Sequence, residues 1–550
     1  MKIRKSENLV DIFAINLFFL VAISISPWYS YDSFNIPKIT LLVMFGAIGS
    51  IQILANFKFA FLFKNNAIKV ISIFSILSFL ITLIKSNAPM VQQIYGREGR
   101  SNGLLAYVSL IIIFVYFSNF ELKNVSIKLN KRIALSGIII LSYSYLQLVG
   151  VDPFKWKTPN LQMFSTLGNP NFLSSFAGLV LVPFLLILFQ ICSDKNKLLR
   201  NILCSFIFTA VFFLIFMSKS YQGFFVAFCC LLSILIIYTL KFNHKNIFIS
   251  ALLVTIFGFI FSFAGVLNKG PLAGILYKAS VTSRGDFFRS GFEMGKSNWI
   301  SGVGIDSFGD YYLAFRDVTA ANRLNGEFTD SAHNYFIDIF ANFGVIFLLL
   351  YLSITLITLI KFIQIIKQEN FNLNIATLFA VWLGLQLQSL ISPTNLVFNI
   401  LIFSISGLVI GSKKLENKSA TQGNNYRSVT VPFVIGLSVT ALIMLPIIQR
   451  DHAILNAYNG NSAENVVRAM DRFPKSINSY NRTLLILNKS GLTQLEIQMA
   501  REAINFNPRS SLPHLIILKS PLSTKDEKLQ SYNRLLMLDP NNSYIRELKP

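Results

Sequence analysis

Residues 171–192 read NFLSSFAGLVLVPFLLILFQIC, a stretch without a charged side chain that is long enough to cross a membrane as a helix. Similar apolar runs recur through the first 448 residues of the 550-residue chain. Hydrophobic residues make up 53% of the chain and charged residues 14%, and the mean hydropathy is positive. This composition excludes a soluble globular protein. The sequence therefore predicts an all-α, polytopic membrane protein.

The apolar runs predict about twelve or thirteen transmembrane helices, because each run has roughly 17–22 residues. The predicted spans are residues 9–27, 37–56, 67–85, 103–120, 132–150, 171–192, 200–217, 222–240, 247–266, 335–360, 373–391, 395–411 and 429–448. One connection, residues 267–333, is much longer than the others in this part of the chain. We expect residues 1–448 to form a single transmembrane domain.

Lysine and arginine residues indicate which way the predicted helices cross the membrane. They are concentrated in the N-terminal segment and in every second connection after it, and the intervening connections contain fewer. The positive-inside rule then places the N-terminus in the cytoplasm. The connections expected outside are 86–102, 151–170, 218–221 and 267–333, together with the tail from residue 449. The formal net charge of +23 therefore reflects topology, and no nucleic-acid partner is expected.

Residues 449–550 differ from the preceding chain, because they are polar, charged and free of predicted spans. Pro474, Pro508 and Pro540 punctuate this tail at intervals of about 33 residues. A helix-like stretch precedes each proline, at residues 463–472, 495–506 and 528–538. This period is typical of tetratricopeptide repeats, so the tail is predicted to be a small α-helical repeat domain. Such arrays bind a partner or stack on neighbouring structure, and nothing in this one indicates catalysis.

The long connection 267–333 is rich in arginine, aspartate and histidine. It contains SRGDFFR at residues 283–289, WISGVGIDSF at 299–308 and DSAHNY at 330–335. A long polar loop with ionisable residues, in a chain otherwise made of membrane spans, is more than a connector. We therefore place the candidate functional site in this loop.

Three further outer segments carry residues that are unusual for connectors: YGREGRSNG at 95–103, GNPNF at 168–172 and SKSYQG at 218–223. Together with the long loop, they resemble the O-antigen ligase and polymerase superfamily of bacterial envelope glycosyltransferases. The likeness covers residues 90–410 and is most specific over 284–344. There an arginine-led helix, a Trp-x-x-Gly-Val-Gly turn and a His-Asn-Tyr helix start follow one another in order.

The resemblance implies a GT-C-like fold in the bacterial inner membrane, with the long loop and the tail in the periplasm. It also implies that a glycan is transferred from an undecaprenyl-pyrophosphate-linked donor to an acceptor hydroxyl, without a metal or another cofactor. Ligation to lipid A core, polymerisation of repeat units and O-glycosylation of a protein all stay open, so the acceptor is a lipid, a glycan or a protein. Membrane lipids surround the chain, and the tail hints at a protein partner.

This sequence departs from the family at one position. Many members carry an arginine in a Ser-Arg-Gly/Ala context after the equivalent of the seventh span. Here the stretch reads Ser220-Tyr221-Gln222-Gly223. Lys219 or Arg100 could supply the missing cation.

The chemistry of the donor suggests which residues to look for. A sugar that leaves a polyprenyl pyrophosphate sheds a highly charged group, and fixed cations or a metal ion must meet that charge. The outer segments contain no Asp-x-Asp pair, no HExxH motif and no Cys/His cluster, so no metal is expected. Arginine is the natural substitute, because its planar fork binds phosphate oxygens and stays charged. We expect Arg284 to be catalytic. The predicted substrate-binding residues are Arg100, Arg289, Arg316, Arg323, Asp330 and Lys219.

The attacking hydroxyl needs a base, and His333 is the candidate. It stands where the tenth predicted span begins, with Asp330 and Ser331 in N-cap-like positions. A helix N-terminus disfavours imidazolium, so the ring is expected to stay neutral and able to accept a proton. Asp330 could orient it. The alternative is an interfacial histidine that hydrogen-bonds to loop carbonyls.

The arginines also have structural alternatives. Arg284 could pair with the nearby Asp286, and Arg100 could extend toward lipid headgroups. Arg316 stands beside Asp317, so an ion pair within the loop is as reasonable there as a substrate contact.

Two other functional classes fit parts of the sequence. A polysaccharide flippase or transporter would have a similar number of spans, but transporters place ionisable residues at mid-membrane, and here these residues concentrate in outer loops. A membrane-anchored scaffold that acts through its tail would leave the long loop unexplained. The sequence therefore favours an enzyme.

Overall fold

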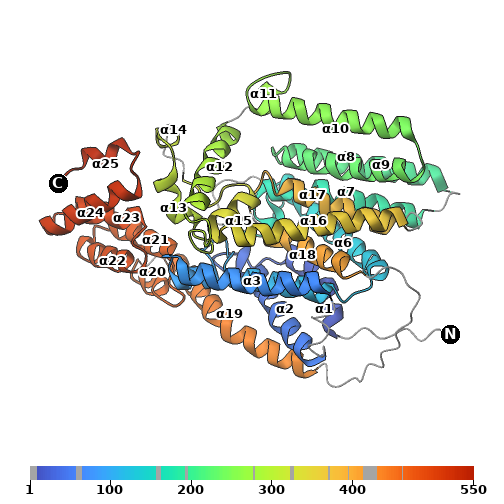
Figure 1. The fold of residues 1–550 in the computed structure, drawn as a ribbon. Coiled ribbons are helices and arrows are strands. Elements are labelled where there is room, and N and C mark those ends of the chain that lie inside the picture. The colour runs from blue at the N-terminus through green and yellow to red at the C-terminus, as the bar shows by residue number, and fades with distance from the viewer. Residues whose placement is uncertain are drawn as a thin grey trace.

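The computed structural model describes residues 9–56, 65–156, 163–192, 196–276, 279–322, 328–368, 372–393, 395–412, 430–460 and 463–550. Throughout these ranges the regular elements are helices, and none is a strand (Figure 1). The prediction of an all-α membrane protein is confirmed, because many of these helices are long and apolar.

Within the described residues, eight helices are long and apolar enough to cross a membrane. They are α2 (Asn35–Asn56), α3 (Asn66–Lys85), α7 (Pro170–Ile191), α8 (Lys197–Met217), α9 (Gln222–Lys241), α10 (Lys245–Val266), α16 (Val345–Gln368) and α19 (Thr430–Asn459). Four shorter apolar helices lie at other predicted spans: α1 (Leu9–Ile23), α5 (Leu104–Phe117), α17 (Leu373–Gln388) and α18 (Leu396–Gly411). The remaining predicted span, residues 132–150, lies in α6 (Leu122–Leu148) except for its last two residues.

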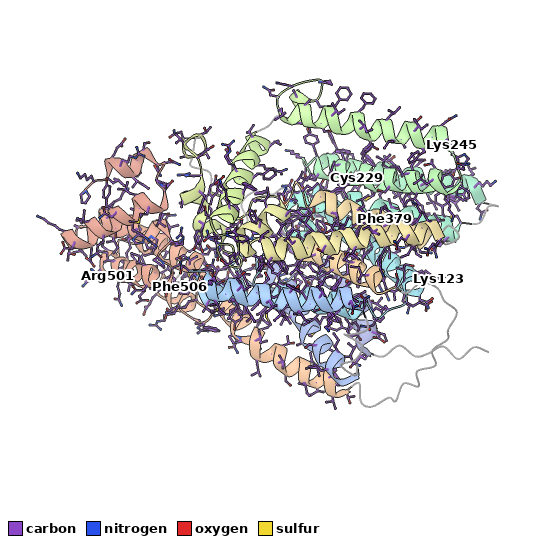
Figure 2. The ribbon with its side chains drawn as sticks, in the orientation of Figure 1. Lys123, Cys229, Lys245, Phe379, Arg501 and Phe506 are labelled. Carbon is purple, nitrogen blue, oxygen red and sulfur yellow. The ribbon has the colours of Figure 1, made fainter. Side chains whose placement is uncertain are left out.

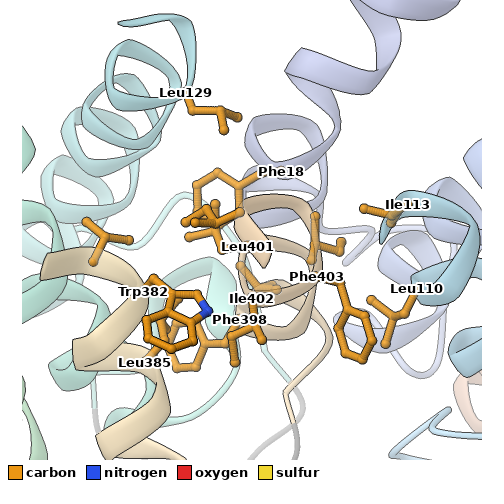
Figure 3. Close-up of a cluster of buried hydrophobic side chains, with 14 of the residues drawn as sticks. Phe18, Leu110, Ile113, Leu129, Trp382, Leu385, Phe398, Leu401, Ile402 and Phe403 are labelled. Atoms are coloured by element: carbon orange, nitrogen blue, oxygen red, sulfur yellow. The ribbon is translucent and has the colours of Figure 1, made fainter. Parts of the chain in front are cut away.

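The centre of the bundle is α18, whose residues Leu396–Ile410 are all buried. Phe18 of α1, Leu110 of α5 and Trp382 of α17 point into the cluster around it (Figure 3). The indole Nε1 of Trp382 donates a hydrogen bond to Ser406 Oγ at 3.0 Å, which satisfies a polar group inside the apolar core. At the edge of the bundle, α10 packs against α9 and leaves most of its side chains exposed (Figure 1).

The predicted span at 335–360 is wrong at its start, because two helices occupy it. Helix α15 (Tyr335–Phe343) ends at Gly344, and α16 begins at Val345. Gly344 has a φ of 78°, and a Cβ there would lie 2.5 Å from the carbonyl carbon of Ile300. The N–H of Val345 donates to the carbonyl of Trp299 at 2.7 Å. A left-handed glycine pressed against the loop therefore separates the short helix α15 from the long apolar helix α16.

The long connection is itself folded. Its described parts form α11 (Ala273–Leu276), α12 (Ala279–Ser297), α13 (Phe308–Phe315) and α14 (Val318–Ala321). A separate apolar core holds α12 and α13 on α15, and it includes Phe287, Met294, Phe308, Tyr312 and Ala332. This core gives α12 and α13 a fixed position on α15.

The tail consists of α20 (Ala463–Met470), α21 (Ile477–Lys489), α22 (Thr493–Phe506), α23 (Ser511–Lys519), α24 (Lys525–Leu538) and α25 (Ser543–Glu547). The three stretches that were expected to be helical lie in α20, α22 and α24, and α21 to α24 pack in sequence. Helix α19 runs without a break across the expected boundary after residue 448. The assignment of the tail to tetratricopeptide repeats stays a prediction.

The two ends of the bundle differ. Lys123 in α6 and Lys245 in α10 lie at one end, and Arg501 and Phe506 of the tail lie beyond the other (Figure 2). The helices α12 to α14 are at the same end as the tail (Figure 1). The folded loop and the tail therefore share one face, away from these two lysines.

Candidate functional site

The turn between α12 and α13 is held against α15 by backbone hydrogen bonds. The N–H of Val303 donates to the carbonyl of Ala341 at 2.8 Å, and Gly304 donates to the carbonyl of Asn342 at 3.2 Å. The Oδ1 of Asn342 accepts from the N–H of Ser307 at 2.9 Å. A Cβ on Gly302, whose φ is 64°, would lie 2.3 Å from the carbonyl carbon of Asn342. Gly302 and Gly304 thus permit close packing of this turn, which fixes the loop beside α15.

His333 lies immediately before α15 and has a left-handed backbone, with a φ of 54°. The N-cap is Asn334, whose Oδ1 accepts from the N–H groups of Phe336 at 3.0 Å and Ile337 at 3.1 Å. The expectation that Asp330 and Ser331 occupy N-cap positions is therefore wrong, because the nearer asparagine caps the helix.

The imidazole of His333 stacks on the ring of Phe287 in α12, with 5.5 Å between the ring centroids. Arg284 stands three residues before Phe287 on the same helix and therefore on the same face. Burial, followed by the positive charges of Arg284 and Arg100, lowers the pKa of His333 from 6.5 to about 4. The loop thus brings His333 and Arg284 together, and the ring is neutral at physiological pH.

Arg284 is half-buried, and burial lowers the pKa of its guanidinium group. Among the described residues, no carboxylate forms an ion pair with it, although Asp286 is close in sequence. A partly desolvated guanidinium without a carboxylate partner binds an incoming anion strongly, because little competes for its hydrogen bonds. This property is what a pyrophosphate-binding residue requires.

Arg100 reaches the same region from the loop before α5. Its Nη1 donates to the side chain of Asp330 at 2.9 Å and to the backbone carbonyl of that residue at 2.5 Å. Its Nε lies 3.3 Å from the carboxylate of Asp306. Burial would raise the pKa of Asp330, but Arg100 and Arg97 outweigh burial, and the pKa lies below the usual value. Asp330 is therefore bound to Arg100, and no hydrogen bond joins it to the ring of His333.

Arg97 is part of the scaffold beside this network. Its Nη1 donates to Asp310 at 2.8 Å, and its backbone N–H donates to Asp306 at 2.7 Å. The N–H of Asn102 donates to the same carboxylate at 3.2 Å. Asp306 thus binds the 95–103 loop to the segment that leads into α13.

The other predicted substrate-binding residues belong to several separate segments. Arg289 is exposed and forms an ion pair with Asp317. Arg316 forms a buried ion pair with Asp539 of the tail. Lys219 is exposed between α8 and α9, and Arg323 lies outside the described residues. Our proposal for the site therefore rests on Arg284, His333, Arg100 and Asp330.

Asp338 was not among the sequence candidates. The N–H of Ala332, next to His333, donates to its Oδ1 at 2.6 Å, so this carboxylate fixes the backbone that presents the imidazole. Its Oδ2 is buried and has no hydrogen-bond partner in the described chain. Burial raises the pKa of Asp338 to about 7, against the opposing effect of Arg100. The sequence signal was an acidic residue in the first turn after His333, but it was assigned to a membrane span.

Residues 204–352 match the protein family described as O-antigen ligase. This part of the chain is therefore similar to O-antigen ligases. The matched stretch runs from α8 into α16 and contains Arg284, His333 and Asp338, whereas Arg97, Arg100 and the tail lie outside the matched residues. No match was found among curated proteins.

Metal binding would require clustered donor side chains. Within the part of the chain that the structure describes, no group of three or more His, Cys, Asp or Glu side chains is arranged to hold an ion. The expectation of metal-independent chemistry stays a prediction.

The pH dependence of the reaction should report the environment of His333. Since a base must be unprotonated, we expect the rate to fall only as the pH drops through about 4, the lowered pKa of this ring. In Arg284→Gln a positive charge that opposes protonation is lost, so the pKa rises and the residual activity falls at a higher pH. The measurement is kcat/KM between about pH 3.5 and 7.5 with purified protein. Asp338→Asn, which cannot titrate, should leave the acid limb in place; a wild-type limb near 6.5 would contradict the assignment.

Proposed function

We propose that the chain transfers a glycan from an undecaprenyl-pyrophosphate-linked donor to an acceptor hydroxyl at the periplasmic face of the bacterial inner membrane. The observation that carries this proposal is the pairing of a neutral imidazole, His333, with Arg284, a guanidinium that has no carboxylate partner among the described residues. The match to the O-antigen ligase family supports glycan transfer in general.

The two side chains supply the two functions that such a transfer needs. The imidazole of His333 accepts the proton of the acceptor hydroxyl as its oxygen attacks the anomeric carbon of the donor sugar. The bond between that carbon and the pyrophosphate oxygen breaks, and Arg284 stabilises the negative charge that develops on the leaving group. Arg100 and Asp330 neutralise each other, so they shape the site next to His333 without adding net charge.

The distribution of charge supports a periplasmic site. Lys123 and Lys245 lie at the end of the bundle away from the loop and the tail (Figure 2). Since lysine and arginine favour the cytoplasmic side, this arrangement supports a periplasmic position for the end that carries His333. The leaving group stays on its polyprenyl carrier, and the loop core on α15 keeps the site close to the membrane surface.

The proposal can be tested with the purified full-length chain in liposomes that contain a lipid-linked glycan extracted from bacteria. Three acceptors are supplied separately: lipopolysaccharide that lacks O-antigen, a second molecule of the lipid-linked glycan, and a periplasmic protein fraction. We expect transfer to one acceptor, seen as a shift on gels, at the same rate with and without EDTA. Transport of the lipid-linked glycan across the bilayer without transfer to any acceptor would favour a flippase and overturn the proposal.

A further inference from the structure

We propose that the tail positions the active site by binding both outer segments that build it, through Glu98 on the 95–103 loop and through Arg316 at the end of α13. This inference rests on the proposed function, because it assigns positioning residues to that reaction. The tail lies outside the residues that match the ligase family.

The first attachment surrounds Glu98. Its carboxylate lies 3.0 Å from the guanidinium of Arg450 in α19 and 2.8 Å from that of Arg482 in α21. The hydroxyl of Ser479 donates to it at 2.6 Å, and the side chain of Asn478 donates to the backbone carbonyl of Glu98 at 2.8 Å. Burial would raise the pKa of Glu98, but the two arginines outweigh it and hold the pKa below its usual range. The carboxylate of Glu98 is therefore ionised, and side chains of the tail bind its oxygens.

The same loop carries the site on its other side. Arg97 and Arg100, on either side of Glu98 in sequence, bind Asp310 and Asp330. Within these four residues, the carboxylate of Glu98 faces the tail, and the guanidinium groups of Arg97 and Arg100 face the site. A shift of Glu98 must move Arg100, because only Gly99 separates them.

The second attachment lies on α13. The Nε and Nη2 of Arg316 donate to the two carboxylate oxygens of Asp539, at 3.0 and 2.5 Å, and both side chains are only 3% exposed. The side chain of Asn541 donates to the backbone carbonyl of Arg316 at 2.8 Å. Five residues earlier, Tyr311 faces the guanidinium of Arg509, which lies 3.5 Å from the centroid of the tyrosine ring. The tail therefore holds α13, whose other side packs in the loop core with Phe287.

Both attachments are buried ion pairs, and such pairs favour one docking geometry more than they add stability. If the tail docked in any other position, several of these charges would be desolvated and would have no partner of opposite charge. The two attachments engage chain segments more than two hundred residues apart, which meet at Asp306 and Asp310. The tail thus holds both segments that carry the site in position, and Glu98 and Asp539 are positioning residues.

The test uses full-length variants that remove one charge and keep the side-chain shape, Glu98→Gln and Asp539→Asn. We expect kcat for transfer to fall at least about tenfold in each while the KM for the lipid-linked donor stays nearly unchanged, because misplacement acts on the reacting geometry. Glu98→Asp and Asp539→Glu retain the charge and should recover most of the rate. Glu527→Gln is the matched control, since it removes an exposed ion pair with Arg501 inside the tail.

Hydrogen exchange of the same solubilised proteins gives a readout that does not depend on activity. Glu98→Gln should increase exchange over residues 95–103, and Asp539→Asn should increase it over 308–316. Wild-type kcat and wild-type exchange in both variants would overturn the positioning role, even if substitutions of His333 abolish transfer. If the wild-type chain transfers no glycan, the proposed function fails, and the exchange measurement alone decides whether the tail holds these segments.

Discussion

Replacing His333 with asparagine is expected to lower the rate of glycan transfer by about 10²- to 10⁴-fold, the usual contribution of a positioned proton acceptor. Asparagine is the informative substitution, because it tolerates the left-handed backbone that this residue adopts, with a φ of 54°. The fold and the N-cap at Asn334 should therefore survive, and only the base is lost. An alanine variant would combine the loss of the base with backbone strain.

The measurement is single-turnover transfer by purified protein, with protein amount and thermal unfolding followed in parallel. His244→Ala is the matched control, since this exposed histidine lies between α9 and α10, outside the candidate site. Near-normal transfer by the asparagine variant, at normal protein levels, would remove His333 from the mechanism.

Replacing Arg284 with alanine is expected to lower the rate by about 10²- to 10³-fold, the usual effect of removing one group that stabilises charge in the transition state. The reason is that Arg284 has no carboxylate partner among the described residues and lies beside the imidazole of His333. Arg284→Lys keeps the charge but loses the planar fork, so its rate should fall between those of the wild type and the alanine variant.

Lys296→Ala serves as the control on the same helix, because this lysine is exposed and pairs only with Glu293 among the described residues. The alanine variant of Arg284 should also bind the lipid-linked donor more weakly, whereas the asparagine variant of His333 should bind it normally. Equal loss of donor binding in both variants would show that these residues support the fold of the loop and not separate chemical steps.

Much of the membrane domain could be predicted from the sequence, because apolar runs of sufficient length allow few alternatives in a bilayer. The break at Gly344 could not, since hydrophobic residues continue on both sides of it and only packing against Ile300 shows why the helix ends. Asp338 was missed for the same reason. A single carboxylate inside an apparent span gives no sign that it belongs to a separate short helix.

The candidate site was predicted in part. His333 and Arg284 belong to one folded loop, and motif order was enough to suggest that they meet. The partners of the remaining arginines depend on tertiary contacts between distant segments. Arg316 of the long loop binds Asp539 of the tail. Arg100 binds Asp330, a residue that was expected to orient His333. Local charge pairs in the sequence, such as Arg316 beside Asp317, did not predict these contacts.

The peripheral position of α10 has a consequence for the membrane in which the protein works. Most of its side chains face outward, and α9 is its main partner, so few protein contacts restrain its tilt. A helix of this kind adjusts its tilt to the thickness of the hydrocarbon layer. The chain passes directly from α10 to α11 and then to α12, which carries Arg284. Acyl-chain length should therefore change the tilt of α10, whereas the loop core on α15 holds α12 and Arg284 in place.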